Sequence, residues 1–239
     1  MEDWLYRRLY ELEDGHWWFR GRRAVIWALL QRAGLPQRAR VLDAGCGTGR
    51  NLVELSFLGP SAGVDSSADA VEFCRRRGLH GVQQAALDAL PFPDASFDLL
   101  VATDVIEHVD DDEAALRELR RVAAPGARLL ITTPAYRWLW SAHDDEHQHK
   151  RRYTRRALLR RARAAGWSIE IATYFNSLLL GPIALARALP RGPEHNDYDR
   201  TPHLLNGALS IPMRLEAALV RRGVRLPAGV SIGLVCRAG

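Results

Sequence analysis

A glycine-rich stretch from Asp43 to Gly49, with the letters DAGCGTG, has the residue types and spacing of a ligand-binding loop. Its glycines let the backbone turn sharply and approach a ligand closely. Asp43 stands at the end of an apolar run, where its carboxylate can reach an ammonium group. Asp65 ends the next apolar run, where an acid can accept hydrogen bonds from both hydroxyls of a ribose. These positions predict a site for a ligand that carries a ribose and an amine.

The glycine pattern has two other interpretations, a dinucleotide-binding loop and a purely structural corner. A dinucleotide-binding GxGxxG loop would require Gly or Ala at position 50, where this chain has Arg50, and this argues against a nicotinamide cofactor. A strand–turn–helix corner with structural glycines is the other alternative, and it leaves both strand-end aspartates unexplained.

Histidines after a predicted strand supply candidate catalytic groups. His143 and His149 lie in the segment 140–154, which follows the predicted strand Arg128–Thr133 at the carboxyl edge, where ligands of open α/β sheets bind. With an unperturbed pKa of about 6.5, histidine is a natural general base for a hydroxyl. We expect His149 or His143 to remove a proton from an acceptor or to orient it. The alternative is that this segment is a solvated, charged loop.

A second set of candidates comprises Asp104, Glu107 and His108, whose spacing allows one helical turn to bring them together. Two carboxylates and an imidazole could bind a divalent cation. The alternative is that Glu107 and His108 pack and hydrogen-bond in the wall of the ligand site, and on this interpretation we expect no metal.

The elements that must position these residues alternate between short apolar runs and helical patterns. This alternation predicts an α/β fold with a parallel sheet and helices on both faces. Strands are expected at Arg40–Ala44, Ser61–Asp65, Val82–Gln84, Phe97–Ala102, Arg128–Thr133, Trp167–Phe175 and Val230–Cys236. Helices are expected at Asn51–Phe57, Ser67–Arg77, Asp112–Ala123 and Thr154–Ala165.

Two segments lie outside the expected core. Residues 1–36 are expected to form an N-terminal helical cap or lid, with two helices separated at Gly15. Residues 37–175 would form the core, and residues 230–239 would add its final strand. The segment 176–229 is too long for a turn between neighbouring strands, so we expect a helical or loop insertion that serves as a lid or a dimer contact.

The composition is that of an ordinary globular protein. Of the 239 residues, 47% are hydrophobic and 26% are charged, which excludes a disordered chain, a collagen or a disulfide-rich miniprotein. The net charge is +5, but no aromatic-interleaved RNA platform accompanies the basic run from Lys150 to Arg163, so no nucleic-acid partner is expected. No apolar run approaches the roughly 20 residues of a membrane span, and no signal peptide is visible, so the expected location is cytoplasmic.

From Arg40 to Pro134 the chain resembles class I S-adenosylmethionine-dependent methyltransferases of the type 11-like group. The resemblance rests on the motifs VLDAGCGTGRN, GVDSS, DALPFPDASFDLLVATDVIEHV and AAPGARLLITTP, which match in order and spacing. It implies a Rossmann-like fold with a seven-stranded, mostly parallel sheet, and S-adenosyl-L-methionine as the cofactor.

The resemblance also implies individual roles. Asp43 would contact the methionine amine directly or through water, Asp65 would hold the ribose, and Asp88 would accept from the exocyclic amine of adenine. Cys46 would be a small residue packed in the loop rather than a nucleophile. The implied cofactor-binding residues are Asp43, Gly45, Cys46, Gly47, Asn51, Asp65, Ser66, Asp88, Ala89 and Thr103.

Two further stretches, HWWFR at His16–Arg20 and HD followed by HKRRYT around His149, resemble a bacterial subgroup associated with cell-envelope and specialised-metabolite methylation. By this resemblance the histidine segment would border the acceptor. The aromatic residues would cover the cofactor or acceptor, and Arg20 or Arg23 would meet the cofactor carboxylate. The alternative is simple packing of a helix on the sheet.

We therefore expect a methyltransferase that moves a methyl group to a small or lipid-linked acceptor by direct displacement. The expected methylated atom is a hydroxyl oxygen of a sugar, polyketide or phenol, and the expected base is His149 or His143. The alternatives are an S-adenosylmethionine-binding cyclase or scaffold without methyl transfer, and an RNA methyltransferase. The latter is disfavoured because TDVIEHV stands where an NPPY-type segment would be needed. Contact with a membrane surface and a homodimer stay open.

Overall fold

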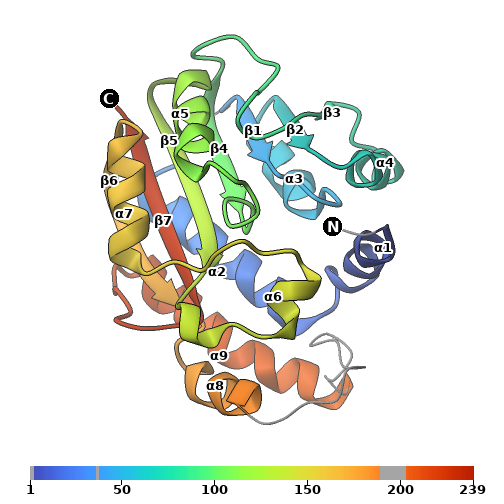
Figure 1. Ribbon diagram of the computed structural model, residues 1–239, viewed down its shortest axis with the longest axis vertical. Helices are drawn as coiled ribbons and strands as arrows, with labels where there is room; N and C mark the ends of the chain where they lie inside the picture. The colour runs from blue at the N-terminus through green and yellow to red at the C-terminus, as the bar shows by residue number, and fades with distance from the viewer. Residues whose placement is uncertain (1–2, 36–37, 189–202) are drawn as a thin grey trace.

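The architecture is a twisted sheet covered by helices on both faces, seen in a computed structural model that describes residues 3–35, 38–188 and 203–239 (Figure 1). Within these residues the sheet has seven strands in the order β3-β2-β1-β4-β5-β7-β6. Neighbouring strands from β3 to β5 are parallel, and β7 lies antiparallel between β5 and β6. The expected Rossmann-like, mostly parallel sheet is confirmed.

The strands agree closely with the apolar runs of the sequence. They are β1 (Val41–Ala44), β2 (Ser61–Asp65), β3 (Val82–Gln84), β4 (Phe97–Thr103), β5 (Ala123–Pro134), β6 (Trp167–Phe175) and β7 (Ser231–Ala238). The largest difference is in β5, which begins at Ala123 rather than Arg128. Ala123 already pairs with Phe97 of β4, and the register then shifts before Arg128, where Gly126 has a φ of +77°.

The helices cover the two faces of the sheet and one of its ends. They are α1 (Asp3–Leu12), α2 (Trp17–Ala33), α3 (Arg50–Leu55), α4 (Ala68–Arg76), α5 (Asp112–Val122), α6 (Ala142–Glu146), α7 (Arg155–Ala164), α8 (Leu180–Ala188) and α9 (His203–Arg221). Side chains one residue ahead of three of these helices fix where they begin: Ser67 for α4, Asp111 for α5 and Thr154 for α7 each accept a hydrogen bond from a backbone N–H of the first turn.

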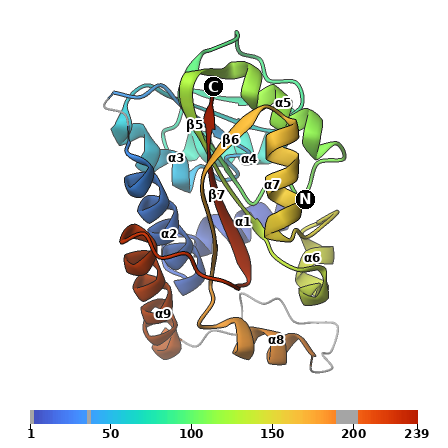
Figure 2. The same ribbon diagram turned by 90° about the vertical axis from the view of Figure 1, so that its left-hand side faces the viewer.

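Figure 2 shows α2 and α9 on one face of the sheet and α5 and α7 on the other. The first pair packs in a core that includes Leu29 and Met213, and the second in a core that includes Leu116 and Leu158. The chain therefore uses α9, from the expected insertion, to complete one face of the sheet. The insertion's stretch 189–202, including its Pro-rich segment, lies outside the described residues.

The strand order reverses between β1 and β4, which are neighbours although distant in the sequence. Ligands of open α/β sheets bind in the crevice at such a reversal, beyond the carboxyl ends of the strands. The glycine loop follows β1 and the segment with Asp104 follows β4, so both lie at this crevice. The helices α6 and α8 lie beyond the same end of the sheet (Figure 1).

Close contact between α2 and α9 depends on Gly21. A Cβ placed there would lie 2.6 Å from Cβ of Met213, too near for any side chain. Gly207 on α9 is the opposite case, since nothing lies within 4 Å of its added Cβ. Replacing Gly21 and Gly207 in turn by alanine therefore tests the contact between α2 and α9 with the same chemical change at both positions.

We expect Gly21→Ala to lower the free energy of unfolding by about 1–3 kcal/mol, because the helices must separate or Met213 must shift in a packed core. Gly207→Ala should leave stability unchanged or raise it by up to about 1 kcal/mol, because alanine favours the helix. Urea denaturation of both variants measures the difference. Equal stabilities would contradict the close packing of α2 on α9.

No helix in the described parts of the chain is both long enough and apolar enough to cross a bilayer.

Candidate functional site

A cavity of about 780 Å³ lies at the carboxyl end of the sheet, within the roughly 300–1,000 Å³ of small-molecule sites. Its walls come from the glycine loop, the ends of β2 and β4, the first turn of α2, the segment from α6 to α7, and α8. The predicted site residues in its lining are Gly45, Cys46, Gly47, Asn51, Asp65, Ser66, Asp88, Thr103, His143 and His149.

The glycine loop requires glycine for two different reasons. Gly45 has a φ of +77°, and a Cβ there would lie 2.3 Å from a methyl carbon of Val105. Gly47 has a φ of +55° and nothing within 4 Å of an added Cβ, so the backbone at this point faces open space. The loop thus forms a cradle that admits a ligand close to the main chain.

Asp65 holds the cradle to the end of β2. Its carboxylate accepts hydrogen bonds from the backbone N–H groups of Gly47, at 2.9 Å, and Ser67, at 3.0 Å. Burial raises the pKa of Asp65, although these two hydrogen bonds oppose the increase. Asp65 is 9% exposed and lines the cavity, so it is placed to receive a polar ligand group.

Asp43 lies beneath the loop rather than in the cavity wall. It is 0% exposed, and neither carboxylate oxygen has a hydrogen-bond partner. Burial raises its pKa to about 7, with a smaller opposing effect from Arg22 and further increases from Asp65 and Glu13. A buried carboxyl of this kind needs a cation nearby to ionise fully, which fits the ammonium group that the sequence predicted at this position.

The raised pKa of Asp43 predicts how stability depends on pH without a ligand. An aspartate in the unfolded chain has a pKa of about 3.9, so between about pH 4 and pH 7 the folded state binds more protons and loses stability as pH rises. Asp43→Asn removes this titration. As pH rises from 5 to 8, the free energy of unfolding of the variant should increase by about 2–3 kcal/mol relative to that of the wild type.

Urea denaturation of both proteins at the two pH values checks this expectation. A stability difference that does not change between pH 5 and pH 8 would show that Asp43 does not titrate in this range. The exposed variant Glu72→Gln serves as the control, since its carboxylate lies on the surface of α4.

Other predicted cofactor-binding residues differ in where the structure places them. Asn51 donates from Nδ2 to Oγ1 of Thr103 at 3.0 Å, which joins α3 to the end of β4 in the cavity wall. Cys46 is buried, and its hydrogen bond with Cys74, together with burial, raises the pKa of its thiol well above the usual value. This fits packing better than nucleophilic chemistry. Ala89 does not line the cavity.

The N-terminal helices cover the cavity. His16, Trp17, Trp18 and Phe19 all contribute to its lining, and Tyr6 reaches it from α1. The insertion holds this cap in place, because Asn206 of α9 accepts from the Trp17 backbone N–H at 2.6 Å and donates to the carbonyl of residue 15 at 2.8 Å.

Neither Arg20 nor Arg23, which were expected to meet the cofactor carboxylate, lines the cavity. Arg23 donates to the Glu13 carbonyl and pairs with Glu54, and Arg20 is exposed. Arg22 instead lines the cavity, where its guanidinium donates to Asp104. The sequence shows an arginine-rich helix start, but only the rotation of α2 on the sheet decides which arginine faces the cavity.

His149 is held in a defined orientation. Its Nδ1 lies 2.8 Å from Oδ1 of Asp144, and Asp144 also accepts two hydrogen bonds from Arg152, at 2.6 and 2.9 Å. Burial raises the pKa of Asp144, but the hydrogen bonds from His149 and Arg152 outweigh it and hold the pKa well below its usual range. Asp144 is therefore ionised, so Nδ1–H of His149 donates to it, and in the neutral form of the ring Nε2 is the nitrogen that carries the lone pair.

The other imidazoles of this region are uncharged. Burial lowers the pKa of His108 to about 4 and that of His147 to about 3, and it lowers the pKa of His143 far below the ordinary value. The rings of His143 and His149 lie 6.1 Å apart, so the two predicted catalytic histidines are brought into one cluster.

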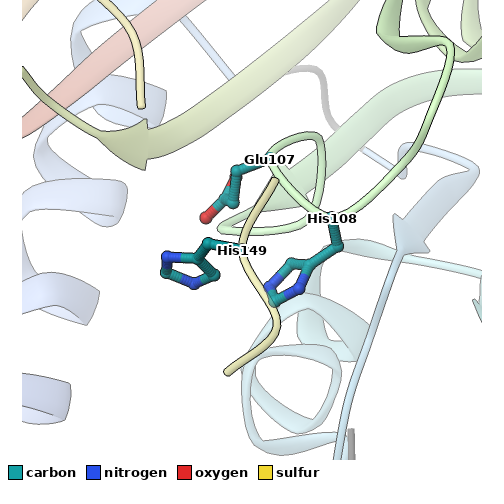
Figure 3. A group of neighbouring side chains, drawn as sticks. All are labelled: Glu107, His108 and His149. Carbon is teal, nitrogen blue, oxygen red and sulfur yellow. The ribbon is translucent and has the colours of Figure 1, made fainter. Parts of the chain in front are cut away.

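Asp104, Glu107 and His108 do not gather on one helical turn as expected. The segment after β4 is an irregular turn, with Asp104 at a φ of +52°, and the Asp104 carboxylate is engaged by Arg22 and by the Thr132 hydroxyl. Glu107 and His108 instead meet His149, which comes from a segment forty residues later in the chain. Figure 3 shows these three side chains gathered at one place.

Several residues of the basic run from Lys150 to Arg163 form ion pairs within the protein. Lys150 pairs with Asp110, Arg152 with Asp144, and both Arg151 and Arg161 with Asp112. Half of its eight basic residues are therefore committed to ion pairs in the described structure.

Comparison with known proteins identifies the family. A model described as a methyltransferase domain matches residues 17–170, well over half of the chain. The chain belongs to this methyltransferase family, and the resemblance to class I S-adenosylmethionine-dependent methyltransferases is confirmed.

Individual relatives agree with this assignment. A Mycobacterium tuberculosis protein named "Probable S-adenosylmethionine-dependent methyltransferase" is 35% identical over 130 residues, 54% of this chain and 46% of its own length. The ubiquinone/menaquinone biosynthesis C-methyltransferase of Hahella chejuensis is 39% identical over 113 residues, 43% of this chain and 45% of its own. The chain thus spans about half the length of these relatives.

A solved structure shares the fold over nearly the full length. The Haloferax volcanii protein that forms a complex with the Trm112 methyltransferase activator superposes with a TM-score of 0.65 at 20% identity, covering 99% of this chain and 95% of its own. At this identity the likeness concerns the fold alone.

Proposed function

We propose that this protein transfers the methyl group of S-adenosyl-L-methionine to a hydroxyl oxygen of a small or lipid-linked acceptor, such as a sugar, polyketide or phenol. The observation that carries the proposal is that the glycine cradle with Asp65 and the oriented His149 line one cavity. One part of the cavity fits an adenosyl ligand, and the other supplies a group that can act on a hydroxyl.

The cofactor would be held by residues that this chain already positions. Asp65 would accept from the ribose hydroxyls, the cradle would receive the methionine portion, and the buried Asp43 would offset the charge of its amine. The sulfonium is an activated methyl donor, so the protein mainly has to align the acceptor and exclude water. Trp17 and Trp18 would exclude water from one side, in keeping with the proposed lid role of residues 1–36.

The acceptor hydroxyl would bind next to His149. Nε2 of His149 accepts the hydroxyl proton, the oxygen forms its bond to the methyl carbon, and the bond from that carbon to sulfur breaks, which leaves S-adenosylhomocysteine. His143 would help to orient the acceptor. The relative named as a C-methyltransferase supplies the alternative, transfer to carbon.

The insertion would complete the acceptor end of the cavity. Ile183, Ala186 and Arg187 of α8 line the cavity, while Leu185 of the same helix and Ile211 of α9 are exposed to solvent. Exposed apolar side chains beside a binding site favour a lipid-linked acceptor, because such a surface can approach a membrane. A faster reaction with a lipid-linked acceptor in vesicles than with its soluble headgroup would support this class. Sedimentation tests whether a second copy covers the same surface instead.

The proposal is tested by incubating the protein with methyl-labelled S-adenosylmethionine and a panel of hydroxylated acceptors. The expected result is S-adenosylhomocysteine formation together with label on an acceptor oxygen, located by mass spectrometry of the product. Label on carbon would overturn the choice of atom. Tight cofactor binding without turnover on any acceptor would favour the S-adenosylmethionine-binding alternative.

A further inference from the structure

We propose that Glu107, His108 and His149 form a binding site for one divalent transition-metal ion in the acceptor half of the cavity. The inference rests on the proposed function, because the ion would lie where the acceptor hydroxyl is expected to bind. It departs from the expectation that the protein holds no metal, and it differs in its ligands from the Asp104-containing set suggested by the sequence.

The three residues bring together one ligand atom each, and these atoms all lie within 4.8 Å of one another (Figure 3). Zinc or a similar ion about 2.0–2.2 Å from each donor requires donor separations of about 3–3.5 Å. The most widely separated donors would therefore have to approach one another by up to about 1.3–1.8 Å to complete the site. Glu107 and His108 lie on the turn after β4, whereas His149 follows α6, so the ion would join two segments at the cavity wall.

Two of the three side chains already use another polar atom in a hydrogen bond. Nδ1 of His149 donates to Asp144. The Glu107 Oε2 accepts from the Thr133 hydroxyl at 3.0 Å. Histidine ligands of metals are typically fixed in this way, by a carboxylate or a carbonyl on the opposite ring nitrogen.

The Glu107 side chain gives an independent reason to look for a ligand. It is 0% exposed, and its Oε1 has no hydrogen-bond partner. A buried carboxyl oxygen without a partner carries a substantial free-energy cost, whichever protonation state the group adopts. A cation bound at Oε1 would remove that cost, and the Thr133 hydrogen bond turns this oxygen rather than Oε2 to the ion.

A hydrogen bond between the two segments holds the donors near one another, because the Lys150 backbone N–H donates to the Glu107 carbonyl at 2.9 Å. Within the second segment, the His149 backbone N–H donates to the Asp144 carbonyl at 2.8 Å. The rings of His108 and His149 lie 4.7 Å apart, edge to face. The fold therefore brings these side chains near one another before any ion binds.

The donor set indicates the class of ion. Two imidazoles and one carboxylate suit Zn²⁺, Co²⁺ or Fe²⁺ better than Mg²⁺, which prefers oxygen ligands. Three protein ligands leave coordination positions open, as in catalytic rather than structural metal sites. An acceptor hydroxyl in an open position would lose its proton to solvent more readily. Since Nε2 of His149 has a single lone pair, in the loaded protein this residue would act through the ion rather than as the base.

The test is a titration of the chelator-treated, full-length protein with Co²⁺, followed by calorimetry and by its visible absorption. We expect one ion per chain, visible bands that indicate nitrogen and oxygen ligands, and much weaker binding of Mg²⁺. Glu107→Gln and His108→Gln should each weaken Co²⁺ binding by about tenfold or more. His143→Gln is the matched control, since it removes a histidine of the same cluster from outside the three, and should retain the affinity.

The proposal is overturned if the wild-type protein does not bind Co²⁺ at one equivalent, or if Glu107→Gln and His108→Gln both bind it as tightly as the wild type. Binding that is lost only in His143→Gln would also overturn it. S-Adenosylhomocysteine affinity, measured on the same samples, shows that each variant is folded. Methyl transfer that persists after chelation, in a protein that binds no Co²⁺, refutes the metal site alone. Failure of the wild-type protein to bind S-adenosylhomocysteine would refute the proposed function.

Discussion

Replacing Asp65 with alanine is expected to weaken the binding of S-adenosylmethionine and S-adenosylhomocysteine by at least about a hundredfold. In the proposed complex this carboxylate accepts hydrogen bonds from two ribose hydroxyls. Hydrogen bonds to a charged group contribute about 1.5–3 kcal/mol each, so the loss of both costs about 3 kcal/mol or more. The same change also frees the Gly47 N–H, which Asp65 holds at 2.9 Å, and loosens the cradle.

Calorimetry with S-adenosylhomocysteine measures this loss without knowledge of the acceptor. Asp65→Asn keeps the shape of the side chain and one acceptor oxygen, so it should bind more tightly than Asp65→Ala and more weakly than the wild type. Glu72→Ala, which removes an exposed carboxylate from α4, should bind as the wild type does. An affinity of Asp65→Ala within a few-fold of the wild type would exclude the ribose contact.

The second large effect is expected for His149→Ala, which should reduce turnover by about 10²–10⁴-fold while cofactor affinity stays within a few-fold of the wild type. The reason is that His149 lies in the acceptor half of the cavity, where Asp144 fixes its ring. The loss is expected whether Nε2 takes the hydroxyl proton directly or holds an ion that acidifies the hydroxyl.

Turnover is measured as S-adenosylhomocysteine formed with an acceptor that the wild type methylates. His80→Ala is the control, because this histidine is exposed and does not line the cavity. Unchanged turnover in His149→Ala would remove this residue from the mechanism. Loss of cofactor affinity together with turnover would instead indicate that the segment around His149 supports the cavity as a whole.

The cofactor half of the site could be predicted from the sequence because its determinants are local. A strand, a glycine turn and a helix follow one another within a dozen residues around Asp43, so residue types alone indicate the geometry. Asp65 ends the neighbouring strand, and parallel strands bring their ends to one edge. The complete burial of Asp43 was not predictable, because it arises from tertiary packing around the end of β1 rather than from the local sequence.

The acceptor half was less predictable because its residues meet across long sequence separations. His149 was identified as a candidate, but its partners Asp144 and Arg152 were missed, since only the folded segment from α6 to α7 brings their charges together. The meeting of His149 with Glu107 was missed for the same reason. The helical spacing after β4 suggested Asp104 as the partner, whereas Arg22 of α2 engages that carboxylate.

The packing of the insertion is a further feature that could not be predicted from the sequence. The stretch 176–229 was expected to be a lid or a dimer contact, and α8 does line the cavity. The role of α9 in completing one face of the sheet depends on Gly21, whose lack of a side chain admits Met213. A single glycine in a predicted helix does not indicate that another helix packs against it.

A calorimetric titration of the wild-type protein with S-adenosylhomocysteine, repeated with a nicotinamide dinucleotide, is the most direct test of the site. If the cradle after β1 and the aspartate at the end of β2 bind an adenosyl ligand, the first titration will show one equivalent per chain and the second will show no heat. Heat with the dinucleotide and none with S-adenosylhomocysteine would contradict the assignment of the cavity.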